Sequence, residues 1–340
     1  MAVLGATLAW LALAGPGGAA SEATGLQPAV TFDAYSPLSG NAEITRRLVT
    51  PLTGAAIHKL AAGGKPLRDQ PIDLPDERFV LYVPPHAPLG GYAVMVFVPP
   101  WEEARLPGGW APVLDRFGVI FVSAARSGND QSVLGRREPL AVLAAHNVMA
   151  RYPVDPRRVY VAGFSGGSRV AMHLALGYPD LFRGAFLNAG SDPIGDAEAP
   201  IPPRELFARF QENTRLVYVT GAQDPASLAA DMRSIQAMRR ACVFDIDSET
   251  TAGAGHALAS PTTLAHALQE LAAPTPPDPA KLAACRAGLE REMTAEFAAI
   301  DALAAAGARD EARKRLRKLD ARYGGLAAPR SVEVSETLGV

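Results

Sequence analysis

The chain has 340 residues, of which 48% are hydrophobic and 20% are charged, enough for one large globular domain with an appendage. Its formal net charge of −2 provides no basic surface for phosphates, so nucleic acid is excluded as an expected partner. The two cysteines lack CxxC spacing and the histidines form no cluster typical of a metal site. We therefore expect neither a metal nor a cofactor.

An uninterrupted apolar run over residues 2–15 opens the sequence. The run is too short to span a bilayer, and the small residues Gly18, Ala19 and Ala20 that follow it suit a cleavage site. This pattern predicts a signal peptide over residues 1–20, no membrane span, and a periplasmic or secreted protein.

Residues 24–77 precede the first strongly apolar strand pattern, and the sequence does not indicate their role. Asn41 is of a type that caps helices, so we expect a helix over residues 42–50. Gly63 and Gly64 are expected to end a second helix.

Strand and helix patterns alternate over residues 78–272. Strands are expected at seven apolar or alternating runs, over residues 79–83, 92–98, 119–123, 159–162, 184–188, 216–220 and 244–247. Helical patterns lie between most of them, notably over residues 139–151, 166–176, 203–211 and 226–240. This alternation predicts an α/β domain with a mainly parallel sheet and helices on both faces.

A proline-rich linker over residues 273–279 closes this domain. Beyond it, apolar residues at helical spacing predict two helices over residues 280–305 and 310–323, forming a helical hairpin over residues 280–323, with a tail over residues 324–340. One such hairpin is too small to be stable alone, so we expect it to pack against the α/β domain.

The two cysteines lie on either side of the linker. In an oxidising compartment Cys242 and Cys285 are expected to form a disulfide that joins the hairpin to the domain, although two unpaired buried cysteines are the alternative. The loop of 43 residues between them would contribute roughly 3 to 4 kcal/mol in the chain-entropy treatment.

The sequence Gly-Phe-Ser-Gly-Gly over residues 163–167 follows an expected strand and precedes an expected helix. A serine that attacks a carbonyl must stand on a sharp turn, and glycines flank it because side chains would collide across that turn. Ser165 is therefore the candidate nucleophile.

A base and an acid for this serine are expected later in the chain, each at the end of a strand. Asp224 follows the strand over residues 216–220, and His256 lies in the loop after the strand over residues 244–247. An imidazole can take and return the serine proton, and a carboxylate behind the ring fixes its tautomer. Asp192, after the strand over residues 184–188, remains open as an alternative acid.

The other candidates fit less well. Asp231 lies in a helical pattern, as do three histidines that we expect to be packing or surface residues: His146, His173 and His266. His58 and His86 precede the serine, against the expected order.

The stretch over residues 151–167 resembles the α/β-hydrolase superfamily, most closely the secreted polyhydroxybutyrate depolymerase-like and feruloyl esterase-like serine esterases. Prolyl oligopeptidase-type hydrolases carry a similar stretch. The resemblance covers roughly residues 78–272. It implies that Ser165, His256 and Asp224 form a catalytic triad.

The resemblance also implies an oxyanion hole, to which the backbone N–H of Gly166 contributes one donor. Such enzymes usually supply the second donor from a His-Gly-type turn, but here Pro99 and Pro100 follow the strand over residues 92–98. Because proline has no N–H, Trp101 or Glu102 is the nearest donor.

These features predict an exported serine hydrolase that cleaves a small or polymeric ester through an acyl-enzyme intermediate. A peptidase or an acyltransferase remains open, because fold and triad do not determine the acyl donor or acceptor. A non-catalytic binding protein with the same fold is the alternative suggested by the unusual proline turn.

Overall fold

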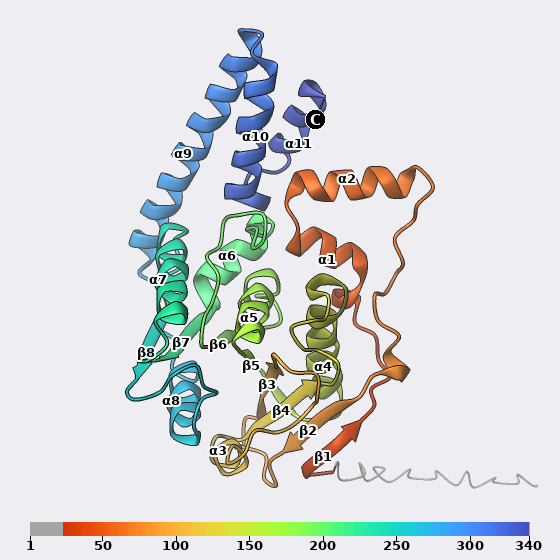
Figure 1. Cartoon of the computed structure of the whole chain (residues 1–340), viewed down its shortest axis with the longest axis vertical. Helices are drawn as coiled ribbons and strands as arrows, with labels where there is room; N and C mark the ends of the chain where they lie inside the picture. Colours follow the sequence, from red (N-terminus) through yellow and green to blue (C-terminus); the bar gives the residue numbers. More distant parts are fainter. Residues whose placement is uncertain (1–22, 340) are drawn as a thin grey trace, which may run out of the picture.

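The computed structural model describes residues 23–339; the predicted signal peptide, residues 1–20, lies outside the described residues. One eight-stranded sheet forms the centre of the molecule, in the order β1-β2-β4-β3-β5-β6-β7-β8 (Figure 1). The strands are Gly25–Val30 (β1), Phe79–Val83 (β2), Tyr92–Val98 (β3), Val119–Ala124 (β4), Val154–Phe164 (β5), Gly184–Asn188 (β6), Arg215–Gly221 (β7) and Ile246–Thr251 (β8). Strand β2 is antiparallel to both of its neighbours, and the other pairs are parallel. This is the strand order of the α/β-hydrolase fold, so the expected fold class is confirmed.

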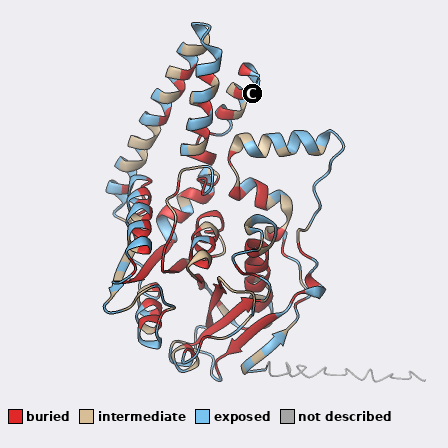
Figure 2. Ribbon diagram, viewed as in Figure 1, coloured by how far each residue is buried: buried red, intermediate tan, exposed pale blue. Residues whose placement is uncertain are grey.

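The sheet is covered on both faces because its central strands are apolar on both sides. Consecutive residues of β3 point to opposite faces of the sheet, so Val96 and Phe97 belong to two separate core layers. Helices α4 (Glu138–Arg151), α5 (Gly166–Gly177), α6 (Arg204–Asn213) and α7 (Pro225–Arg240) contribute to the larger layer, and α3 (Ala111–Phe117) and α8 (Pro261–Leu271) to the smaller one. Figure 2 shows the sheet as the most continuously buried part of the fold.

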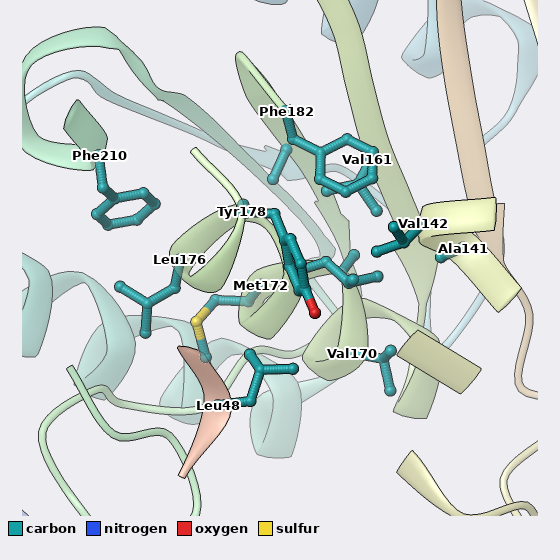
Figure 3. Packing of buried hydrophobic residues seen from close by; sticks show 14 of the residues in the cluster. Leu48, Ala141, Val142, Val161, Val170, Met172, Leu176, Tyr178, Phe182 and Phe210 are labelled. Atoms are coloured by element: carbon teal, nitrogen blue, oxygen red, sulfur yellow. The ribbon is translucent and has the colours of Figure 1, made fainter. Parts of the chain in front are cut away.

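Close packing in the larger layer joins the domain to the segment before it. In Figure 3 the ring of Tyr178 lies among Val161 of β5, Met172 of α5 and Leu48 of the helix α1 (Asn41–Leu48). A Cβ added at Gly177 would lie 2.5 Å from a Leu48 methyl group, so this glycine lets α1 approach α5 closely.

The two edge strands differ from expectation. Strand β1 was not anticipated, and β8 begins two residues later than the expected strand and extends to Thr251. Neither strand has a buried residue, so pairing with β2 and β7, rather than a hydrophobic pattern, determines where they lie.

The segment over residues 24–77 therefore supplies the first strand and two helices, α1 and α2 (Pro51–Ala62). The expected capping role of Asn41 is wrong. Gly40 occupies the cap position without a side-chain bond, while the Asn41 amide donates to the Arg68 carbonyl at 2.7 Å. The Asn41 N–H also donates to the Asp69 carbonyl at 3.0 Å. The Asn41 side chain therefore binds the loop that leads back to the sheet and does not cap the helix.

Three helices end the chain: α9 (Pro279–Ala305), α10 (Arg309–Tyr323) and α11 (Arg330–Leu338). Asp278 caps α9 by accepting from the Lys281 N–H at 2.8 Å, and Gly307 turns the chain with a φ of 79°. Helices α9 and α10 form the expected hairpin, which projects from the body of the molecule (Figure 1). The tail contains α11, which packs against α10 and α2. No helix within residues 23–339 has both the length and the apolarity needed to cross a bilayer.

Cys242, just after α7, and Cys285, in α9, form the expected disulfide, with their Cα atoms 5.8 Å apart. Neighbouring side chains strengthen this attachment, because Arg286 donates to Gln211 at 2.7 Å and to Glu212 at 2.9 Å. The disulfide and these polar contacts join the base of the hairpin to α6 and α7.

Replacing both cysteines by serine is expected to lower the free energy of unfolding by roughly 3 to 4 kcal/mol, because the 43-residue loop gains freedom in the unfolded chain. The hairpin should loosen first near Cys285, because the attachments that remain there are polar contacts and a linker, whereas residues farther along it, such as Phe297 and Leu316, pack in the core. Urea unfolding and limited proteolysis with mass mapping measure both effects. Equal unfolding midpoints and unchanged cleavage within residues 273–323 would contradict this prediction.

Candidate active site

Ser165 stands on the turn between β5 and α5 with backbone angles φ 55° and ψ −121°. An L-residue rarely adopts this conformation, which marks the strained turn that presents a nucleophile. The Ser165 N–H donates to the Asn188 carbonyl at 2.9 Å, which holds the turn against β6. A Cβ added at Gly163 would lie 2.1 Å from the Gly167 carbonyl oxygen, so the motif glycine is required by close packing.

The structure brings together the three side chains proposed from the sequence. Nε2 of His256 lies 2.9 Å from Oγ of Ser165, and Nδ1 of His256 lies 2.6 Å from Oδ2 of Asp224. The His256 side chain is 48% exposed whereas that of Asp224 is 8% exposed. The arrangement can pass a proton from the serine hydroxyl to a ring that is oriented by a buried carboxylate.

Asp224 is fixed by its place at the start of α7. It is the N-cap of that helix, and its Oδ1 accepts from the Ser227 N–H at 3.1 Å. Burial of Asp224 disfavours its charged form, but hydrogen bonds from Ser227 and His256 outweigh this and hold the pKa of the carboxyl below its usual value. Asp224 therefore faces His256 as a carboxylate at neutral pH.

The competing candidates have other partners. Asp192 pairs with Arg169 at 3.0 Å rather than with His256. His266 pairs with Glu249 at 2.8 Å, and the partly exposed His173 lies beside the buried Glu138. None of these residues bonds to the Ser165 hydroxyl, whose partner within residues 23–339 is His256.

Asn188, at the end of β6, is a residue that the sequence reasoning missed. Besides accepting from Ser165, it donates from its side chain to the Val219 carbonyl at 3.1 Å and accepts from the Ala259 N–H at 2.8 Å. It thereby ties the serine turn to β7 and to the loop that carries His256. The sequence could have indicated this role, because Asn188 is a polar residue at the end of an otherwise apolar strand.

The strand end before the prolines lies against the first turn of α5. A Cβ added at Gly167 would lie 1.9 Å from the Val98 carbonyl oxygen, so the two backbones are in direct contact. Gly166 is the first residue of α5, where backbone N–H groups lack intrahelical partners and favour a negative charge. Within residues 23–339 the N–H groups of Trp101 and Glu102 donate to no backbone carbonyl.

Two aromatic rings, those of Phe164 and Trp101, lie beside His256. The Phe164 ring lies 5.1 Å from the His256 ring and 6.3 Å from the Trp101 ring, between centroids. The guanidinium of Arg105 covers Trp101 at 4.4 Å. A partly exposed apolar surface therefore adjoins the serine.

A second carboxylate, Asp231, is buried in α7 beyond the site. It accepts from the Thr220 hydroxyl at 2.5 Å, and burial raises its pKa to about 6 although this hydrogen bond opposes the shift. Its other oxygen has no partner within the described residues. Ionised Asp231 is therefore an unfavourable buried charge at neutral pH.

Comparison with known proteins found no matching family model. The chain is 32% identical over 98 residues to a poly(3-hydroxybutyrate) depolymerase from Ralstonia pickettii, a match covering 25% of this chain and 20% of that protein. The match thus spans about one fifth of the relative's length.

Solved structures with a similar arrangement include an acetyl xylan esterase from Aspergillus awamori. It is 12% identical with a TM-score of 0.45, over 58% of this chain and 94% of that one. A dipeptidyl peptidase 4 from Porphyromonas gingivalis is 15% identical with a TM-score of 0.42, over 57% of this chain and 33% of that one. The expected resemblance to the α/β-hydrolase superfamily is confirmed, and the fold assignment rests on the strand order itself.

Asp231→Asn is expected to stabilise the protein more at pH 8 than near pH 4. Because the folded-state pKa of Asp231 is raised above its value of 3.8, the charge penalty is absent below about pH 4, grows up to about pH 6 and is constant above. The full gain is about 3 kcal/mol, since one pKa unit corresponds to about 1.4 kcal/mol. Urea melts of wild type and variant across this range measure it. A stability difference that does not change with pH would show that Asp231 titrates normally.

Proposed function

We propose that this protein is an exported serine hydrolase that cleaves an ester through an acyl-enzyme intermediate, with Ser165, His256 and Asp224 as its catalytic triad. The observation that carries the proposal is the continuous hydrogen-bonded chain from the serine on its strained turn, through the imidazole, to the buried carboxylate.

The geometry suits a two-step acyl transfer. As the Ser165 oxygen bonds to the ester carbonyl carbon, Nε2 of His256 takes the hydroxyl proton and Asp224 stabilises the resulting imidazolium. The carbonyl oxygen becomes an oxyanion, which the N–H groups of Gly166 and of Trp101 or Glu102 receive. Collapse breaks the bond to the alcohol, which leaves with the proton from His256. Water then attacks the acyl-enzyme by the same route and regenerates Ser165.

The substrate is proposed to be a hydroxyacid ester, either small or polymeric. Half of the His256 side chain is exposed and Ser165 is partly exposed, so a chain segment can reach the serine without entering a deep cavity. The apolar rings of Phe164 and Trp101 offer contact to an aliphatic or aromatic acyl group. The sequence match to a poly(3-hydroxybutyrate) depolymerase supports this class of ester.

Export is proposed on two grounds, the apolar start of the sequence and the disulfide between Cys242 and Cys285. Disulfides persist in oxidising compartments and are rare in the cytosol. Mass spectrometry of the protein recovered from an exporting host tests this: an intact Met1 together with two free thiols would rule it out.

Ser165→Ala is expected to abolish hydrolysis of p-nitrophenyl esters and labelling by a fluorophosphonate probe, without unfolding the protein. Ser168→Ala is the matched control. Ser168 lies in the first turn of α5, just after Ser165, and its buried hydroxyl has no hydrogen-bond partner within the described residues, so this variant should keep both activities. Turnover of several per cent or more in Ser165→Ala would refute the nucleophile. A wild-type protein inert to all esters and to the probe would favour a binding role.

The same assay separates the two candidate acids. Asp224→Asn should lower kcat on the order of 10⁴-fold, as in serine proteases, because an amide favours the wrong imidazole tautomer. Asp192→Asn should have a far smaller effect, because Asp192 contacts Arg169. The opposite ranking would transfer the role of the acid to Asp192.

A further inference from the structure

Arg137 is a buried arginine that lacks an acidic partner. Its residue is 3% exposed, and it ends a π-helical turn, Val133–Arg137, that leads directly into α4. Within residues 23–339 no carboxylate forms an ion pair with it. Burial lowers the pKa of the guanidinium, and the charges of Glu138 and Glu102 offset this only in part. A buried charge without an ion partner is unfavourable for folding unless its donors are hydrogen-bonded.

The guanidinium joins two loops beside the site. Nε donates to the Ser127 carbonyl at 3.0 Å, and Nη2 donates to the Pro99 carbonyl at 2.9 Å. Pro99 begins the oxyanion strap, which we define as residues 99–102. Ser127 begins the neighbouring loop over residues 127–131, which includes Asn129.

Both loops contact the turn that carries the serine. The Asn129 N–H donates to the Pro100 carbonyl at 3.1 Å, and the Arg126 N–H donates to the Glu102 carbonyl at 2.6 Å. A Cβ added at Gly166 would lie 2.2 Å from Oδ1 of Asn129, which places this side chain directly over the first residue of α5. The strap, the loop and the nucleophile turn are therefore in mutual contact.

The prolines explain why an arginine is needed here. Pro99 and Pro100 have no N–H, so this part of the strap can be anchored only through its carbonyl oxygens. In a trans peptide the C=O and the following N–H point in opposite directions. The Asn129 N–H, in the loop that Arg137 also binds, holds the Pro100 carbonyl and therefore sets the direction of the Trp101 N–H. A guanidinium, which has several donors in a rigid plane and no acceptor, suits two carbonyls at once.

We propose that Arg137 is the positioning residue of the oxyanion side of this site. By clamping the carbonyls of Pro99 and Ser127 it keeps the strap and the loop together, so that the Trp101 N–H is aimed at the oxyanion. Arg137 itself touches no reacting atom. The inference rests on the proposed hydrolase function and assigns the support of its second oxyanion donor.

Arg137→Met is expected to lower kcat 10- to 100-fold with little change in KM, because the oxyanion donor acts mainly in the transition state. The loss should be less than the 10²- to 10³-fold that follows complete removal of a donor. Arg137→Lys, which keeps the charge and can bind one carbonyl, should recover part of it. The rates are p-nitrophenyl ester turnover per active site, with sites counted by stoichiometric fluorophosphonate labelling.

Normalising to labelled sites separates positioning from folding, because a merely structural arginine would lower the number of sites and not the turnover of each. Arg47→Met is the matched control. Arg47 is 4% exposed and likewise donates to a backbone carbonyl, that of Gly177, at the far end of α5. That variant should lose stability while turnover per site stays unchanged.

Methylguanidine at millimolar concentration should raise turnover per site in Arg137→Ala but not in Arg47→Ala, since it can enter the space left by the Arg137 side chain and bind the Pro99 and Ser127 carbonyls. Unchanged turnover per site in both Arg137→Met and Arg137→Lys would overturn the inference while leaving the hydrolase function in place. A wild-type protein without activity or labelling would instead overturn the proposed function. If Arg137→Met does not fold, Arg137→Lys decides: full turnover per site contradicts the clamp, and reduced kcat at constant KM supports it.

Discussion

Glycine backbones packed without side chains at the carboxyl ends of β3 and β5 form the contact on which the rest of the site depends. Ser165 can occupy its strained conformation only because Gly163 and Gly167 allow the chain to fold back on itself. Gly167 in turn lies against the Val98 carbonyl. A methyl group at either glycine would separate these backbones, and the serine turn, the first turn of α5 and the end of β3 would no longer pack together.

The strand ends then assemble the remaining side chains, because parallel strands end at the same edge of the sheet. Asn188 lies between β5 and β7 and bonds to the serine turn, to Val219 and to the loop that carries His256. The Trp110 indole N–H holds the same loop by donating to the Ala259 carbonyl at 3.0 Å. His256, which follows the exposed edge strand β8, is thus restrained by residues outside its own strand.

The site and the helical appendage illustrate two ways of holding irregular chain. At the site, the buried guanidinium of Arg137 and the buried amide of Asn188 bind backbone carbonyls and N–H groups. Such contacts suit segments whose atoms must be placed to within about half an ångström. At the hairpin, a disulfide, apolar packing and exposed ion pairs join helices that already satisfy their own backbone groups. We expect loss of the first kind of contact to affect the proposed reaction, and loss of the second to affect stability and proteolysis.

The sequence by itself determined the fold class, the serine turn and the order of the candidate residues. These are local signals: apolar alternation predicts buried strands, and only glycine fits beside Ser165. It also indicated that Cys242 and Cys285 could pair. Strand β1 was missed and β8 was placed two residues too early, because none of their residues is buried and their positions follow from pairing with β2 and β7.

Only the tertiary structure decided which side chains meet. From the sequence, Asp192 and Asp224 both end strands; in the fold Asp192 lies against Arg169 and Asp224 against His256. The contacts of Asn188 with Ala259 and of Arg137 with Pro99 join residues that are 71 and 38 positions apart. No local pattern encodes such contacts, because they depend on the order in which the strands lie in the sheet and on the loops packed above their ends.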